Sequence, residues 1–305
     1  MQKVIIYGGS GFVGSHLVSA LEEQDYLVVV CDRIEPRFNF KGQFIQCDIM
    51  HSLRGQWSHE DESYLSNPYA VINLAGKSIF GKFTTEHKQA IYDSRITGTR
   101  NIITLFQEPR FKPRVYVAAS AVGYYGDQGQ KEITEHGSMG DNFLASVVAD
   151  WEGEARRVDA MGIRLVILRQ GHILGVGGLV GALAPLYEKG LGGPIGSGNF
   201  YFPWIHVEDL VAYYIEALQS QDTRGMYNAV VGSPITYRQF SRSLARALKK
   251  PHIFFIPKIA LRIRFGEFAD EITASQRIVP QRILTMPYEP VFTDIQEALE
   301  YQLGK

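Results

Sequence analysis

The chain has 305 residues, of which 45% are hydrophobic and 21% are charged, and its formal net charge at pH 7 is −1. At roughly 100–200 residues per domain, this length predicts one large domain or two modest ones. The nearly balanced charge gives no positive field that would gather polyanions, so we do not expect a nucleic-acid partner.

The N-terminal residues and the cysteines indicate the cellular compartment of the protein. Met1, Gln2 and Lys3 lead directly into an apolar run and a glycine cluster, without the pattern of a cleavable signal peptide. No apolar run approaches the ~18 residues of a membrane span. Cys31 and Cys47 fit a reducing compartment, and the scattered histidines lack metal-ligand spacing. We expect a cytoplasmic protein with no membrane partner, since neither a spanning nor an anchoring segment is indicated, and with no disulfide or metal site.

Short runs rich in Val and Ile alternate with longer amphipathic stretches over the first 170 residues. The continuous apolarity of the runs predicts strands that are covered on both faces. We expect strands at residues 4–7, 27–31, 44–47, 70–74, 115–119 and 165–168, and helices at residues 12–24, 84–107 and 142–161. This alternation predicts an α/β fold, a Rossmann-type doubly wound parallel sheet.

The stretch VIIYGGSGFVGSHL, residues 4–17, follows the first predicted strand and opens the first predicted helix. Its glycines fit two frames, Gly8-x-x-Gly11-x-x-Gly14 and Gly9-x-Gly11-x-x-Gly14. In this context glycine allows positive φ, close approach of a pyrophosphate to the backbone, and close helix–strand packing. We expect these glycines, with Phe12 and Val13 at the helix start, to bind a dinucleotide. The alternative is a tight turn without a ligand.

Asp32 lies eighteen residues after Gly14, at the end of the second predicted strand. A carboxylate there accepts hydrogen bonds from both ribose hydroxyls of adenosine, which favours NAD. The adjacent Arg33 favours NADP instead, because it could pair with a 2′-phosphate or stack on adenine. The cofactor is therefore NADP or NAD, and either residue could also be only a solvated strand end.

Further motifs resemble the extended short-chain dehydrogenase/reductase superfamily, in its nucleotide-sugar epimerase and dehydratase group. They are CDI at residues 47–49, NLAG at residues 73–76 and ITGT at residues 96–99. Five stretches resemble one uncharacterised branch, the "epimerase family" proteins: VINLAGKSI, DSRITGTRNI, SAVGYYGD, GLGGPIGSG and WIHVEDLV. The resemblance implies that the cofactor is also contacted by Asp48, Ile49, Leu74, Ala75, Gly76 and Arg95.

The same resemblance places residues at the nicotinamide end. It puts Ala119 and Ser120 beside the ring at the end of the fifth strand, and Gln170, Gly171, His172 and Ile173 after the sixth. The glycine-rich residues 189–204 and Trp204-Ile205-His206 would line a substrate cleft. Without the resemblance, they would be a surface loop and a helix-start or packing histidine.

The later part of the chain carries helical patterns at residues 206–220 and 236–249. We predict a dinucleotide-binding Rossmann domain over residues 1–170, with residues 206–228 packing back onto it. Residues 171–305 would form mainly a smaller, substrate-binding α/β domain. No apolar helix face in the sequence marks an oligomer interface.

Hydride transfer in this superfamily uses a Tyr-x-x-x-Lys pair, which this chain lacks. The tyrosine position holds Phe143 or Leu144, and the lysine position holds Val147 or Val148. The candidate catalytic residues that remain are Ser120, Tyr124 and Tyr125. A phenol with a pKa near ~10 and no neighbouring cation is a poor base at neutral pH.

Arg95 replaces an asparagine that the superfamily commonly uses. It could lower the pKa of Tyr124, bind an acidic substrate, or pair with a surface carboxylate. We therefore expect an NAD(P)-dependent oxidoreductase or epimerase acting on a small polar substrate, with a nucleotide-linked molecule as one candidate. The alternative is a cofactor-binding sensor or scaffold that has lost turnover and serves a protein partner.

Overall fold

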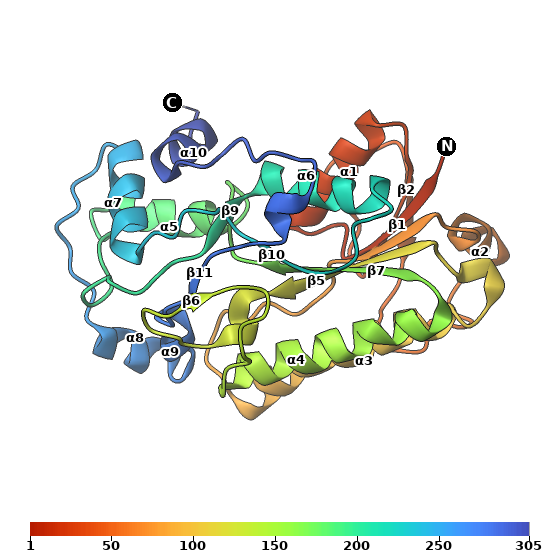
Figure 1. Ribbon diagram of the computed structural model, residues 1–305, viewed down its shortest axis with the longest axis horizontal. Helices are drawn as coiled ribbons and strands as arrows, with labels where there is room; N and C mark the ends of the chain where they lie inside the picture. The colour runs from red at the N-terminus through yellow and green to blue at the C-terminus, as the bar shows by residue number, and fades with distance from the viewer. Residues whose placement is uncertain (305) are drawn as a thin grey trace.

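A seven-stranded parallel sheet forms the centre of the molecule, with strand order β10-β7-β5-β4-β1-β2-β3 (Figure 1). The computed structural model describes residues 1–304. The strands are β1 (Lys3–Tyr7), β2 (Leu27–Asp32), β3 (Gln43–Gln46), β4 (Ala70–Asn73), β5 (Val115–Ala121), β7 (Arg164–Gln170) and β10 (Gly225–Ala229). The predicted Rossmann-type α/β fold is confirmed. The six predicted strands are present, and β10 is an edge strand that was not predicted.

Helices cover both faces of the sheet (Figure 1). One face carries α1 (Phe12–Glu23) and α6 (Val207–Gln219), and the other carries α2 (His59–Leu65), α3 (Thr85–Leu105) and α4 (Phe143–Ala155). Alternate residues of β1 divide between the two cores, since Val4 and Ile6 face α1 while Ile5 and Tyr7 face α3. Burial on both sides explains why the strands are continuously apolar.

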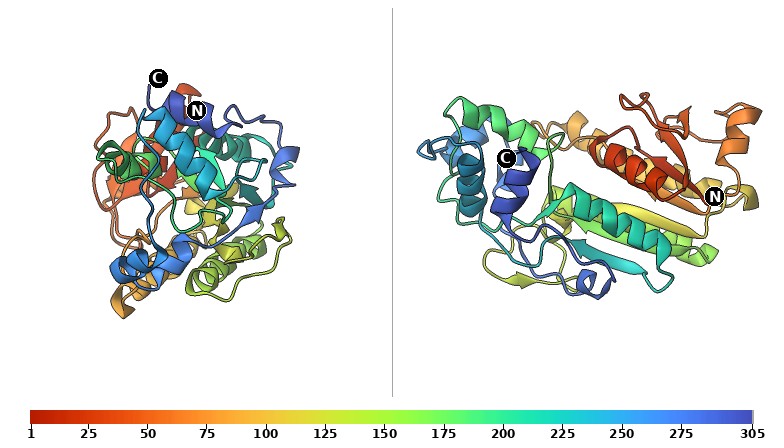
Figure 2. Two further views of the ribbon diagram at one scale, coloured as in Figure 1. Left: turned by 90° about the vertical axis from the view of Figure 1, so that its left-hand side faces the viewer. Right: turned by 90° about the horizontal axis from the view of Figure 1, so that it is seen from above.

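The remaining elements lie together at one end of the sheet (Figures 1 and 2). Two short parallel pairs join β6 (Glu132–Ile133) to β11 (Arg277–Ile278) and β8 (His172–Leu174) to β9 (Trp204–His206). The helices there are α5 (Leu179–Glu188), α7 (Tyr237–Ala247), α8 (Lys258–Phe265), α9 (Phe268–Ile272) and α10 (Ile295–Gln302). The short 3-10 helices of the chain are η1 (Pro109–Phe111), η2 (Val122–Tyr125), η3 (Arg156–Met161) and η4 (Ile283–Thr285).

The chain crosses between these two parts more than once. Residues 207–219 and 225–229 return as α6 and β10 to the central sheet, and Ile283 of η4 joins the core under α1 and α6. Conversely, β6 leaves the N-terminal half to pair with β11. The end of the sheet where β5 and β7 finish is therefore enclosed by segments from both halves.

Three further observations concern residues 1–304. No helix there has both the length and the apolarity to cross a bilayer. Cys31 and Cys47 are buried and unpaired. The described side chains include no cluster of three or more His, Cys, Asp or Glu residues that could hold a metal ion.

Candidate functional site

The glycine-rich turn between β1 and α1 is closed by main-chain packing. Gly8 has φ +81°, and a Cβ atom there would lie 2.7 Å from the Ala75 nitrogen. A Cβ at Gly14 would lie 2.4 Å from the Gly9 oxygen. Gly11 is exposed, and the nearest atom to a Cβ there would be the Gly8 oxygen at 3.3 Å. Gly8 and Gly14 are therefore required by the fold, whereas Gly11 keeps open the space in front of α1.

The start of α1 carries main-chain donors without a side-chain cap. Gly11 is its N-cap residue and offers no side-chain oxygen, so the N–H groups at Phe12 and Val13 are available to an anion. The Phe12 ring lies against the turn before α5, where Cβ atoms at Gly175 and Gly178 would lie 2.3 and 2.5 Å from it. These glycines were not predicted to matter, although their spacing before a helix is a visible signal.

A cavity of about 660 Å³ opens beside this turn. Its size is that of a small-molecule site, for which roughly 300–1,000 Å³ is typical. Nine of the predicted cofactor residues line it: Gly8, Gly11, Asp32, Arg33, Asp48, Ile49, Leu74, Ala75 and Gly76. The structure therefore gathers four separate sequence motifs, which follow β1, β2, β3 and β4, around one cavity.

Asp32 is held by main-chain donors at the end of β2. Its two carboxylate oxygens accept hydrogen bonds from the Ser10 N–H at 3.1 Å and the Arg33 N–H at 2.8 Å. The Ser10 hydroxyl donates to the Ile34 oxygen at 2.7 Å, which fastens the glycine turn to the segment after β2. The Arg33 side chain is exposed at the rim of the cavity.

The far wall of the cavity comes from α3, and none of the α3 residues that line it was among the predicted site residues. They are Glu86, Gln89, Ala90, Asp93 and Ser94, with Lys77 from the loop before the helix. A spacing of three or four residues places the helical members on one face. This helical spacing of the residues is the feature of the sequence that indicates which face of α3 lines the cavity.

The predicted residues of the nicotinamide end lie beyond this cavity. Ala119 is buried two residues before the end of β5, and Ile173 is half-buried against the core under α1. Gln170 donates from Nε2 to the Tyr214 hydroxyl at 2.5 Å. A Cβ at Gly171 would lie 2.8 Å from the Pro203 oxygen, so this glycine lets β7 turn closely past the residues before β9.

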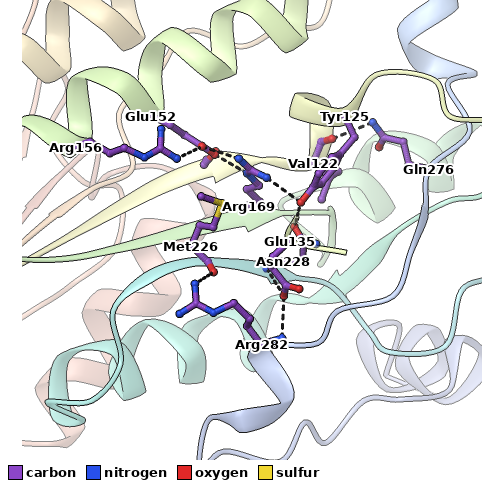
Figure 3. Close-up of polar contacts among 11 residues, drawn as sticks. Val122, Tyr125, Glu135, Glu152, Arg156, Arg169, Met226, Asn228, Gln276 and Arg282 are labelled. Atoms are coloured by element: carbon purple, nitrogen blue, oxygen red, sulfur yellow. Dashed lines mark hydrogen bonds and ion pairs between the residues drawn. The ribbon is translucent and has the colours of Figure 1, made fainter. Parts of the chain in front are cut away.

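A buried network of hydrogen bonds and ion pairs joins α4 to β5 and β7 near the ends of these two strands (Figure 3). Arg169 contacts Glu152 of α4 through two nitrogens, at 2.7 and 2.8 Å, and both residues are about 1% exposed. Arg156 adds a contact at 2.9 Å. Burial alone would raise the pKa of Glu152, but the hydrogen bonds and charge of Arg169 outweigh it and lower that pKa. Glu152 is thus a buried carboxylate held in its ionised form.

Ser120 and Tyr125 belong to this network. The Ser120 hydroxyl is buried and donates to Glu152 at 2.7 Å. The Tyr125 hydroxyl accepts from Arg169 at 2.9 Å and donates to Asn228 Oδ1 at 2.7 Å. Burial raises the pKa of Tyr125, although Arg169 opposes the shift. These positions argue against the predicted catalytic roles of both residues, because their hydroxyl groups are engaged inside the protein.

Tyr124 is placed differently. It is half-buried, and the Arg169 guanidinium carbon lies 3.6 Å from the centre of its ring. The Tyr125 ring meets it edge-on at 5.3 Å. Among residues 1–304, no group hydrogen-bonds to the Tyr124 hydroxyl. Of the three predicted catalytic residues, Tyr124 alone has a free hydroxyl, and it has a cation beside it that the sequence did not reveal.

The α4 positions expected for a Tyr-x-x-x-Lys pair carry only packing residues. Leu144, Val147 and Val148 are buried, and Phe143 packs edge-on against Phe83 with 5.5 Å between ring centres. No proton carrier therefore comes from these positions.

Arg95 lies on α3 near this apolar cluster. It donates to the main-chain oxygens of Lys77 at 2.9 Å and Ile91 at 3.4 Å, and lies 5.3 Å from the centre of the Trp151 ring. Burial lowers its pKa to about 10, so it remains a cation at neutral pH. No carboxylate among the described residues pairs with it, which leaves the surface ion-pair alternative without support.

The predicted substrate-cleft residues of β9 are not at a surface. Trp204, Ile205 and His206 are buried, and the His206 ring accepts from the Glu208 N–H and contacts Gln302 of α10. The expectation that they line a cleft was wrong, and the helix-start alternative is what the structure shows. His172 instead is exposed and stacks on Phe202 with 4.2 Å between ring centres.

Comparison with known proteins agrees with this geometry. Residues 4–230 match the family model described as NAD dependent epimerase/dehydratase family. The chain belongs to this family. Residues 256–302 match a second model, Domain of unknown function (DUF1731). The predicted resemblance to epimerase family proteins is thereby confirmed.

Individual relatives cover nearly the whole chain. Epimerase family protein YfhF of Bacillus subtilis is 34% identical over 97% of this chain and 96% of its own. The human epimerase family protein SDR39U1, crystallised with NADPH, has a TM-score of 0.88 at 28% identity and covers 99% of both chains. A nucleoside-diphosphate sugar epimerase from Corynebacterium glutamicum has a TM-score of 0.78 at 28% identity, and the match spans 58% of its chain.

Proposed function

We propose that this chain binds NADPH or NADH and acts as an oxidoreductase or epimerase on a small polar substrate. The observation that carries the proposal is the bare start of α1, where Gly11 keeps a side chain out of the space in front of free N–H groups. Asp32 and Arg33 line the same cavity at the position for an adenosine ribose. The NADPH in the human relative's crystal supports this assignment.

The residues have separate roles in this proposal. The glycine turn and α1 would hold the pyrophosphate, and Asp32 or Arg33 would select the ribose or its 2′-phosphate. The bound nicotinamide would supply or accept the hydride. Tyr124 would exchange a proton with the substrate oxygen, because its hydroxyl is free while the Arg169 guanidinium stacks on its ring.

The substrate is proposed as a nucleotide-sugar-like molecule. Support comes from the family's description as epimerases and dehydratases and from the sugar epimerase of Corynebacterium glutamicum. Arg95 would bind an acidic group of the ligand, because it is a half-buried cation without a carboxylate partner in residues 1–304.

A second candidate is a cofactor-binding sensor or scaffold without turnover. It is favoured by the apolar side chains at the Tyr-x-x-x-Lys positions and by the engagement of Ser120 with Glu152. The two candidates share cofactor binding and differ in whether the cofactor is ever oxidised.

One experiment separates them. Bound NADPH and NADH are followed by fluorescence titration, and then by near-ultraviolet absorbance while carbonyl compounds and nucleotide sugars are added. For an enzyme, we expect oxidation of the bound cofactor that Tyr124→Phe reduces at least tenfold and the distant, exposed Tyr301→Phe leaves unchanged. Cofactor binding without any oxidation, with Tyr124→Phe behaving like the parent, would assign the sensor role.

A further inference from the structure

Positive charge is concentrated in one part of a nearly neutral chain. Residues 223–266 contain nine of the 31 Lys and Arg residues and none of the 32 Asp and Glu residues. The stretch covers β10, α7, the connection to α8, and α8 itself. Such a strong separation of sign within one chain indicates an anionic partner for this part of the surface.

The same region exposes large apolar side chains. Helix α8 has no buried residue, and its Ile259 and Ile263, four residues apart on one face, are 64% and 73% exposed. In the segment before it, Ile253 is 84% and Phe255 is 56% exposed. We call residues 249–265, from Lys249 to the end of α8, the basic ridge.

The cations of the basic ridge are mostly free of internal partners. Within the described part of the chain, no carboxylate pairs with Lys249, Lys250 or Lys258, and all three are exposed. Arg262 does pair with Asp270 of α9 at 2.9 Å. The ridge lies at the end of the molecule opposite α2, away from the strands that carry the glycine turn (Figure 1).

We propose that the basic ridge docks this protein on the surface of an anionic lipid bilayer. Ile253, Phe255, Ile259 and Ile263 would enter the boundary between headgroups and acyl chains, and the neighbouring lysines would contact the lipid phosphates. The inference is independent of the proposed reaction, because none of these side chains lines the cavity beside the glycine turn. Binding of this kind needs neither a spanning helix nor an anchoring segment, the two features that the sequence led us not to expect.

The shape of the ridge favours a membrane over a peptide. A docked peptide needs a groove, whereas α8 packs inward through Leu261 and leaves Ile259 and Ile263 projecting from the surface. Apolar side chains interleaved with unpaired lysines suit a flat surface that combines negative charge with an apolar interior. A second copy of the chain would have to meet the ridge with an acidic surface, and this becomes one outcome of the test.

The test is flotation of the full chain with vesicles of equal parts phosphatidylglycerol and phosphatidylcholine, against vesicles of phosphatidylcholine alone. We expect binding to the anionic vesicles only, and a decline when salt is raised from about 0.05 to 0.5 M. Removing one charge near such a surface costs roughly a fivefold loss of partitioning. The double variant Lys249→Gln/Lys250→Gln should therefore bind about 25-fold more weakly.

Ile259→Gln/Ile263→Gln should also lose at least tenfold in binding. Matched controls are Lys41→Gln/Lys112→Gln, which removes exposed charges elsewhere, and Leu284→Gln/Val291→Gln, which changes apolar residues that are 61% and 70% exposed. Both controls should bind vesicles like the parent, and all four variants should keep the parent's NADPH affinity, which separates this test from that of the proposed function.

Three results would overturn the proposal. The parent could fail to float with anionic vesicles at low salt, or the ridge variants could bind as well as the controls. The parent could also self-associate in light scattering, lose this association in Ile259→Gln/Ile263→Gln, and ignore vesicles, which would assign the ridge to a second copy.

Discussion

Replacing Glu152 with glutamine tests the buried network beneath the candidate site. Glu152 is 1% exposed and receives hydrogen bonds from Ser120, Arg156 and two nitrogens of Arg169, all between 2.7 and 2.9 Å. A glutamine amide nitrogen would face N–H donors, and Arg169 would lose the carboxylate with which it pairs. Removing one partner of a buried pair typically costs about 3–5 kcal/mol, and we expect a loss of that size in the free energy of unfolding.

The measurement is urea unfolding followed by tryptophan fluorescence and circular dichroism at several pH values. The pKa of Glu152 is lowered in the folded state, so its stabilisation is present above the unfolded value of about 4.3 and is lost as the pH falls through the folded value. The difference between parent and variant should therefore be full at pH 7 and shrink below about pH 4.

Glu154→Gln is the matched control on the same helix. Glu154 pairs with Arg100 and Arg157 at the surface, where such contacts contribute about 0–1 kcal/mol. The reasoning is refuted if Glu152→Gln costs no more than Glu154→Gln, or if its effect stays undiminished well below pH 4, where the carboxylate is protonated.

Three further predictions concern the cofactor cavity and the start of α4. Gly11→Val should lower the free energy of unfolding by no more than about 2 kcal/mol, because Gly11 has φ −77° and a Cβ there would meet only the Gly8 oxygen, at 3.3 Å, yet it should lower NADPH affinity at least tenfold in fluorescence titration. Arg33→Ala should weaken NADPH by roughly tenfold, as expected for one charge-assisted contact, and leave NADH unchanged; equal effects on both would exclude a 2′-phosphate contact. Burial raises the pKa of Glu271, which accepts a hydrogen bond from the α4 cap residue Asn142, to about 7. Stability should therefore fall as the pH rises from about 4.5 to 7, and Glu271→Gln should flatten that slope in urea titrations; an unchanged slope would contradict it.

The N-terminal half could be predicted because its signals are local. Apart from β3, whose sequence is QFIQ, each strand from β1 to β7 in the central sheet is a short, largely apolar run, and the glycine turn joins neighbouring elements. β10, with the sequence GMYNA, lacks such a run. It is a strand because Gly225 to Ala229 pair in register with Val166 to Gln170 of β7, a tertiary contact that no local pattern predicts.

The residues of the candidate site likewise divide into those that local sequence predicts and those that long-range contacts place. Its glycines and Asp32 could be read from the sequence, since their roles depend on residues a few positions away or at the end of the next strand. The position of Ser120 could not, because its partner Glu152 is 32 residues away and Arg169 is a further 17 residues along the chain. Ser120 and Tyr125, two of the predicted catalytic residues, thus belong to a buried ion-pair network.

The network also changes the interpretation of the missing lysine. The sequence suggested a tyrosine without a neighbouring cation, because Val147 and Val148 occupy the lysine positions on α4. The structure brings a cation from β7 instead, since Arg169 stacks on Tyr124 while Glu152 holds its guanidinium in place. In the proposed function, Glu152 and Arg169 would therefore be positioning residues for Tyr124. A variant such as Arg169→Lys, which keeps the charge but loses the planar stack and the double contact to Glu152, should disturb the proton transfer more than the cofactor affinity.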